Sequence, residues 1–149
     1  MNNKEQIKNH MEYLGYNVIY HETLEDIILC SKRGYPPTML ECKEHGIRFF
    51  AFYNMNEIAK NNPVEFKNYV NRLNRATCVI KFFVDKDGNF NFGSFSLGEY
   101  DRQQFADFIY LWENDLGPGM DNVPGTDRFL LNMDNLPQED YESNSTAYA

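Results

Sequence analysis

Residues 63–116 constrain the fold of this chain more than any other stretch, because their hydrophobic period changes from helical to strand-like and back. The first part predicts a helix over residues 63–75. Asn62 and Pro63 are typical of a helix start, as N-cap and first helical residue, and Glu65 is placed to reach back to the cap. Four apolar residues recur three or four positions apart, so one face of this helix is expected to be buried: Phe66, Tyr69, Val70 and Leu73.

The second part of this stretch predicts a β-hairpin followed by another helix. Apolar residues recur at every second position over residues 78–84 and 89–97, on either side of Asp85-Lys86-Asp87-Gly88. The helix begins after Asp101, and Gly117-Pro118 is expected to end it. Its apolar stripe consists of Phe105, Phe108, Ile109, Trp112 and Leu116.

The hydrophobic pattern also decides the register of the hairpin. A two-residue turn would pair Phe83 with Phe92 and leave both faces of the hairpin mixed. A three-residue loop, with Gly88 in the left-handed conformation, separates apolar from polar side chains, and this register is predicted. One face then carries Ile80, Phe82, Val84, Phe90 and Phe92, and the other carries Lys81, Phe83, Asn89, Asn91 and Phe95.

The first half of the chain predicts one short helix and a series of strands. Residues 3–14 have the apolar spacing of an amphipathic helix, which Gly15 ends. Short strand-like runs follow, separated by turn residues, and this pattern favours an antiparallel meander. These runs are residues 17–21, 26–32, 38–43 and 47–54, and residues 56–61 form one more helical turn.

The order of elements is therefore α, three or four β, α, β, β, α, which predicts an α+β fold. Both groups of strands are expected in one antiparallel sheet with the helices on its inner face, as a two-layer sandwich. The inward stripes and strand faces give the expected core: Leu14, Phe66, Val70, Leu73, Ile80, Phe82, Val84, Phe90, Phe92, Phe105, Phe108, Ile109 and Trp112.

This arrangement resembles a known family. The run Tyr69-Val70-Asn71-Arg72-Leu73-Asn74-Arg75, the hairpin around Asp85-Lys86-Asp87-Gly88 and the helix after Asp101 are similar to the YbjN-like proteins, a bacterial family with the type III secretion chaperone-like fold. The resemblance covers residues 3–116. It implies a regulatory or chaperone-like protein without enzymatic activity, often a dimer.

Composition indicates one compact domain. The 149 residues are 42% hydrophobic and 15% aromatic, which is enough for a single core. The sequence has no run of about 18 apolar residues, as a membrane span requires, and its first ten residues are too polar for a secretory signal. A cytoplasmic location without membrane contact is therefore expected. Cys30, Cys42 and Cys78 suit free thiols in a reducing compartment.

The net charge of −8 is distributed unevenly. From Gly117 onward, six acidic residues accompany Arg128 alone, a net charge of −5, which leaves −3 for residues 1–116. Direct nucleic-acid binding is not expected, because it needs a basic face. The sequence offers no complete set of metal ligands, no phosphate-binding loop and no nucleophile motif. Neither a cofactor nor enzymatic chemistry is therefore expected.

The chain changes character after the last predicted helix. Residues 1–117 are expected to form the domain, and residues 118–149 an acidic, proline-containing tail that is mostly extended. Apolar residues return over residues 128–136 with the spacing of a short amphipathic helix, which would be stable only when docked. We expect this segment to dock on the folded domain or on a neighbouring copy.

Several strands are apolar on both faces, although a sheet covered by helices on one side needs only one apolar face. The outer faces and the tail together give a predicted partner-binding set: Phe50, Phe52, Phe83, Phe95, Phe129, Leu130, Met133 and Leu136.

We interpret the chain as a cytoplasmic adaptor, regulator or chaperone-like protein that binds a protein partner. A homodimer through the outer sheet face or an edge strand is expected, unless the tail covers that face instead. Two alternatives stay open. One is an acidic, virus-type inhibitor of host machinery that mimics nucleic acid, and the other is an enzyme or small-ligand carrier with a pocket between helices and sheet.

Overall fold

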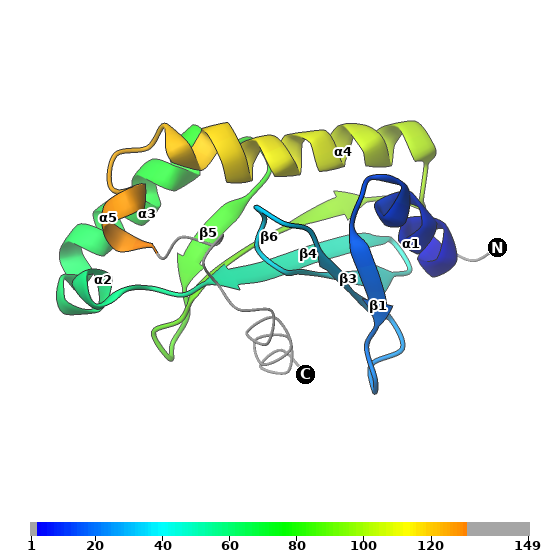
Figure 1. Cartoon of the computed structure of the whole chain (residues 1–149), viewed down its shortest axis with the longest axis horizontal. Helices are drawn as coiled ribbons and strands as arrows, with labels where there is room; N and C mark the ends of the chain where they lie inside the picture. The colour runs from blue at the N-terminus through cyan, green and yellow to red at the C-terminus, as the bar shows by residue number, and fades with distance from the viewer. Residues whose placement is uncertain (1–2, 131–149) are drawn as a thin grey trace.

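The computed structural model describes residues 3–130 and shows one antiparallel sheet with helices packed on one side (Figure 1). Its six strands lie in the order β1-β2-β3-β4-β6-β5, so β1 and β5 are the edges. The elements are α1 (Asn3–Tyr13), β1 (Asn17–Tyr20), β2 (Ile27–Ser31), β3 (Thr38–Lys43), β4 (Gly46–Tyr53), α2 (Glu57–Asn61), α3 (Pro63–Ala76), β5 (Lys81–Val84), β6 (Phe90–Leu97), α4 (Arg102–Asn114), η1 (Asp115–Gly119) and α5 (Thr126–Phe129). The predicted α+β architecture and the predicted order of elements are confirmed.

The helix starts follow the sequence signals in part. Asp101 caps α4, because its carboxylate accepts a hydrogen bond of 2.8 Å from the backbone amide of Gln104. Asn62 precedes α3 as expected, but its side chain donates to the carbonyl of Ile58 in α2 and makes no cap hydrogen bond. The two helices follow one another so closely that the end of α2 uses this side chain.

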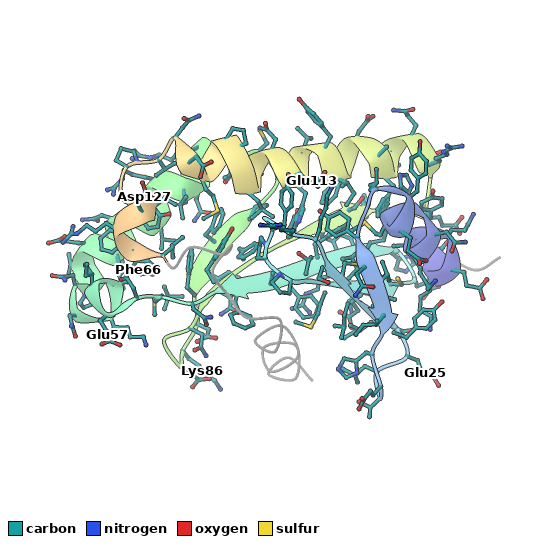
Figure 2. The ribbon with its side chains drawn as sticks, viewed as in Figure 1. Glu25, Glu57, Phe66, Lys86, Glu113 and Asp127 are labelled. Atoms are coloured by element: carbon teal, nitrogen blue, oxygen red, sulfur yellow. The ribbon has the colours of Figure 1, made fainter. Side chains whose placement is uncertain are left out.

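The β5–β6 hairpin has the predicted register. Phe82 pairs with Phe92, and Phe83 pairs with Asn91. The Asp85 amide donates to the carbonyl of Asn89 at 2.9 Å, which leaves a three-residue loop. Gly88 in this loop has a φ of 85°, which favours glycine. Lys86 projects at the tip of the hairpin (Figure 2).

The inner face of the sheet and the helices share one core. Figure 1 shows α4 running along the sheet, with α1 near its first turn and α3 near its last. Ten predicted core residues are buried, and Leu14 and Phe108 are partly buried against the core. The prediction that Val84 lies in the core is wrong. Val84 is 37% exposed because it ends an edge strand next to the hairpin loop. The ten are Phe66, Val70, Leu73, Ile80, Phe82, Phe90, Phe92, Phe105, Ile109 and Trp112.

The last helix does not end at Gly117-Pro118, so that prediction is wrong. The α4 helix passes directly into η1, a π-helical turn with Pro118 inside it. The Met120 amide donates to the carbonyls of Asp115 and Gly117, which continues the helical path beyond the proline. A π-helical turn inserts one extra residue and lets the chain accommodate a proline without a full break.

The folded domain also extends past the boundary predicted at residue 117. Met120, Val123, Phe129 and Leu130 belong to the same core as the helices and the inner sheet face. Leu130 also forms an antiparallel bridge with Met55. Residues 118–130 are thus part of the domain, because four of their apolar side chains complete its core. The rest of the predicted tail, residues 131–149, lies outside the described residues.

Two further properties concern residues 3–130 only. No helix in this part of the chain has the length and apolar character that crossing a membrane requires. The cysteines are free, with Cys30 buried, Cys42 partly buried and Cys78 exposed.

Candidate partner-binding surface

The outer face of the sheet, opposite the helices, is rich in apolar side chains because strand residues alternate between faces. On β2, β3 and β4 four of them form a second cluster, separate from the main core, with Leu24 packed against it. We call this the outer cluster: Ile27, Leu29, Met39 and Phe50. Its members are only 4% to 8% exposed. A large share of this face is therefore withdrawn from solvent.

Beside the outer cluster, the face formed by β4, β6 and β5 contains a hollow of about 490 Å³, which we call the outer hollow. Gly93 of β6 forms its floor, paired with Phe50 of β4 on one side and Lys81 of β5 on the other. A Cβ atom at Gly93 would lie 2.7 Å from the carbonyl oxygen of Phe49, so no larger residue fits without a shift of the backbone. The hollow thus exists because a strand residue in the middle of the face has no side chain.

Two exposed phenylalanines form the walls of the outer hollow. Phe83 of β5 is 51% exposed, and Phe95 of β6 is 46% exposed. The Phe95 ring packs against Gly46, where a Cβ atom would lie 2.5 Å from its Cζ. The Phe95 ring can take this position because Gly46 has no side chain. The outer hollow is therefore a depression with two aromatic walls and Gly93 at its floor.

Two positive side chains border the outer hollow. The Arg48 guanidinium lies 4.7 Å from the centre of the Phe50 ring, a cation–π geometry, and its Nη1 is 3.6 Å from Oε1 of Glu41. Lys81 projects from the same face and is exposed. The hollow therefore offers apolar surface inside and positive charge at its edge.

The structure places the predicted partner-binding residues in three settings. Phe83 and Phe95 line the outer hollow and are exposed, Phe50 is buried between the hollow and the outer cluster, and Phe52 is half-buried on the same face. Phe129 and Leu130 are 2% and 8% exposed in the helix-side core, so their prediction as partner-binding residues is wrong. Met133 and Leu136 lie outside the described residues.

The burial of Phe129 has a clear physical cause. Its ring centre lies 5.5 Å from that of Phe66 and 5.4 Å from that of Tyr69, so it fills the space beside α3. The neighbouring Arg128 pairs with Glu65 on the same helix. Figure 2 shows Phe66 of α3 lying beside the α5 turn that carries Asp127. The segment does dock on its own domain, but on the helix side of the sheet.

Sequence reasoning missed the glycines and charges of this surface. Gly93 and Gly46 lie in strands otherwise rich in aromatic residues, a pattern typical of close backbone approach. Their meaning depends on the pairing of β4 with β6, which are separated by two helices and a strand in the sequence. Arg48 and Lys81 likewise gain their role only when that pairing brings them to one face.

The described part of the chain shows no candidate metal site, and two of its cysteines are weak nucleophiles. Within residues 3–130, no three His, Cys, Asp or Glu side chains lie close enough to hold a metal ion. Burial raises the pKa of Cys42 to about 11 and that of Cys30 further, so both stay protonated and weakly nucleophilic at neutral pH. The lining of the outer hollow is mainly aromatic and apolar, with Arg48, Lys81, Asn91 and Ser94 as its polar members.

Comparison with known proteins shows a structural relative. No family model matches the sequence, and no curated protein sequence matches it. The structure is similar to the crystal structure of YbjN, a proposed transcription regulator from E. coli, with a TM-score of 0.64 and 14% sequence identity. The match covers 86% of this chain and 95% of YbjN. The chain therefore has a YbjN-like fold.

Proposed function

We propose that this chain is a non-enzymatic, cytoplasmic regulator or adaptor that binds a protein partner through the outer hollow. The observation that carries this proposal is the position of Phe83 and Phe95, two exposed aromatic rings around a depression of about 490 Å³. Monomeric proteins rarely expose clustered apolar side chains without a binding role. Protein interfaces are enriched in aromatic residues and arginine and commonly centre on a pocket that receives an anchor from the partner.

The fold and the free thiols support the same function. YbjN, which shares the fold, is itself a proposed transcription regulator. Three free cysteines suit the reducing cytoplasm. The hollow lies on the outer sheet face and not between helices and sheet, where a small-ligand carrier would hold its ligand.

A comparison of two exposed aromatic residues tests this function. The full-length protein, the Phe83→Ala variant and the Tyr110→Ala variant are used for affinity purification from the source cells with quantitative mass spectrometry. Tyr110 is the matched control, because it is 70% exposed on α4, far from the hollow. We expect a partner that Phe83→Ala loses and Tyr110→Ala keeps, and that binds the purified wild-type protein directly.

The Lys81→Glu variant adds a second test at the edge of the hollow. If the partner uses the hollow, this change alters binding and its salt dependence, while thermal unfolding of the protein stays unchanged. Equal recovery of every protein by wild type, Phe83→Ala and Lys81→Glu would contradict the proposed function.

A further inference from the structure

We propose that residues 131–149 of the same chain cover the outer face of the sheet, lying over the outer cluster and reaching the edge of the outer hollow. The proposal concerns the same face as the proposed function but does not require that a partner exists.

The burial of the outer cluster gives the first argument. Ile27, Leu29 and Met39 are 4% to 6% exposed, although they point away from the helices. Leu24 packs against this cluster. Apolar side chains gathered on three strands, away from the main core, form a surface on which a further apolar segment can pack.

The place where the described chain ends gives the second argument. Leu130 pairs with Met55, two residues beyond the end of β4. The outer cluster includes Phe50 of that same strand, and five strand residues span only about 17 Å. The segment that follows Leu130 therefore starts close to the end of β4, the strand that contributes Phe50 to the outer cluster.

The length of the remaining segment is sufficient. Nineteen residues follow Leu130 in the sequence. Fully extended, they would reach at most about 68 Å, and as a helix about 28 Å. Either form can cross from the end of β4 to the outer cluster. Because the segment is tethered beside its target, its effective concentration there is high and little intrinsic affinity is required.

The chemistry of the segment matches the chemistry of the face. Its first six residues include three apolar side chains, and the whole segment carries four acids and no Lys or Arg. The outer face offers apolar surface next to Arg48 and Lys81, so apolar contact and charge complementarity favour the same arrangement. The apolar residues are Leu131, Met133 and Leu136, and the acids are Asp134, Glu139, Asp140 and Glu142.

A second copy of the chain matches this face less well. A two-fold symmetric contact places the same patch on both subunits. The Arg48 and Lys81 side chains of both copies would then meet across one interface, and juxtaposed like charges are unfavourable. The acidic segment of the same chain brings the opposite charge.

Paramagnetic NMR on the full-length protein tests the proposal. A nitroxide is attached to cysteine in the Gln138→Cys variant, two residues beyond Leu136, with the exposed Cys78 replaced by Ser. Cys30 and Cys42 react slowly with the label, because burial raises the pKa of both thiols. We expect the strongest loss of signal at the methyl groups of Ile27, Leu29 and Met39, and little at Ile7 of α1.

Two matched double variants show whether the apolar residues drive the contact. Met133→Asp with Leu136→Asp is expected to restore the lost methyl signals. Asn132→Asp with Asn135→Asp adds the same negative charge at neighbouring polar positions. With this pair the methyl signals are expected to stay as weak as in the protein without these changes. If both pairs behave alike, the apolar side chains do not dock and the proposal is overturned.

A mixed sample separates the chain's own segment from that of a neighbour. Nitroxide-labelled chain without isotopes is mixed with isotope-labelled chain without nitroxide. Signal loss within one chain, and none in the mixed sample, supports the cover. Signal loss in the mixed sample would instead show that the segment of a second copy covers the face. No signal loss in either sample would show that residues 131–149 do not contact the face. Both outcomes overturn the proposal without bearing on whether Phe83 binds a partner.

Discussion

The carboxylate of Asp115 accepts a hydrogen bond from the backbone amide of Val79, with 2.8 Å between Oδ2 and the nitrogen. The amides of Cys78 and Ile80 donate to the same carboxylate, at 2.8 Å and 3.1 Å. Asp115 is only 1% exposed, so three backbone amides replace the water that its charge would otherwise bind. This contact joins the π-helical turn after α4 to the start of β5, and so fixes one end of the hairpin that forms the outer hollow.

Replacing Asp115 by Ala should destabilise the protein by about 2–4 kcal/mol, because it leaves three backbone amides without their acceptor, the buried amide of Ile80 among them. Asp107→Ala is the control, since Asp107 is exposed on α4 and accepts a hydrogen bond from the equally exposed Gln103. Its effect should stay within about 0.5 kcal/mol. Urea unfolding measures both free energies, and similar values for the two variants would show that the buried contact contributes little.

Gly125→Ala should also be destabilising. Gly125 has a φ of 108°, in a region that residues with a side chain rarely adopt, and a Cβ atom there would lie 3.1 Å from the Tyr69 ring and 3.3 Å from Phe129. We expect a loss of about 2–3 kcal/mol from strain and crowding together.

The Gly98→Ala variant separates these two causes. Gly98 has a similar φ of 95°, but a Cβ atom there meets no atom within 4 Å. Its loss should therefore be about 1 kcal/mol, from backbone strain alone. Thermal unfolding measures the loss of stability in both variants. Equal losses for Gly125→Ala and Gly98→Ala would mean that the space between α3 and α5 is not tightly packed.

The hairpin and helices were predictable because their signals are local. The register of β5 and β6 follows from the period of two and from Gly88, both contained in one short stretch. The Asp101 cap and the buried stripe of α3 are equally local. Residues that are close in sequence are sufficient to determine these features.

The misread C-terminal region depends on contacts that no local pattern reveals. Phe129 lies in a short apolar run that suits docking on any hydrophobic surface, and only the fold shows that Phe66 and Tyr69 supply that surface. The π-helical turn around Pro118 is tied to the rest of the fold through Asp115, which accepts from amides 35 to 37 positions away. The outer hollow is similar, since Gly93 becomes a floor only when β4 pairs with β6.

Phe82→Ala should destabilise the core by about 3–5 kcal/mol. Phe82 is 3% exposed, and its ring centre lies 5.7 Å from that of Phe90 and 5.5 Å from that of Phe92. Tyr110→Ala serves as control, with an expected change within about 0.5 kcal/mol, because Tyr110 is 70% exposed. Urea unfolding followed by Trp112 fluorescence measures both, and an unchanged midpoint for Phe82→Ala would place this side chain outside the core.

His10 should make stability depend on pH. Its ring stacks on Phe105 with centres 4.9 Å apart, and its Nδ1 lies 2.8 Å from the Tyr100 hydroxyl. Burial lowers the pKa of His10 below its usual value, and the positive charge of Arg102 lowers it further. The folded state therefore binds this proton less readily than the unfolded state does.

The sign of the effect follows from that difference. Because the pKa of His10 is lower in the folded state, its contribution is fully present above the unfolded value of about 6.5 and is lost as pH falls from there through the lower folded value. Unfolding free energies of wild type and His10→Gln, measured by urea between pH 8 and pH 5, should diverge on the acidic side, with wild type declining more steeply. His45→Gln is the control, because the His45 side chain is 83% exposed and should leave the wild-type slope intact. Parallel curves for wild type and His10→Gln would show that His10 takes up a proton equally well in both states, so that its stacking on Phe105 imposes no preference for the neutral ring.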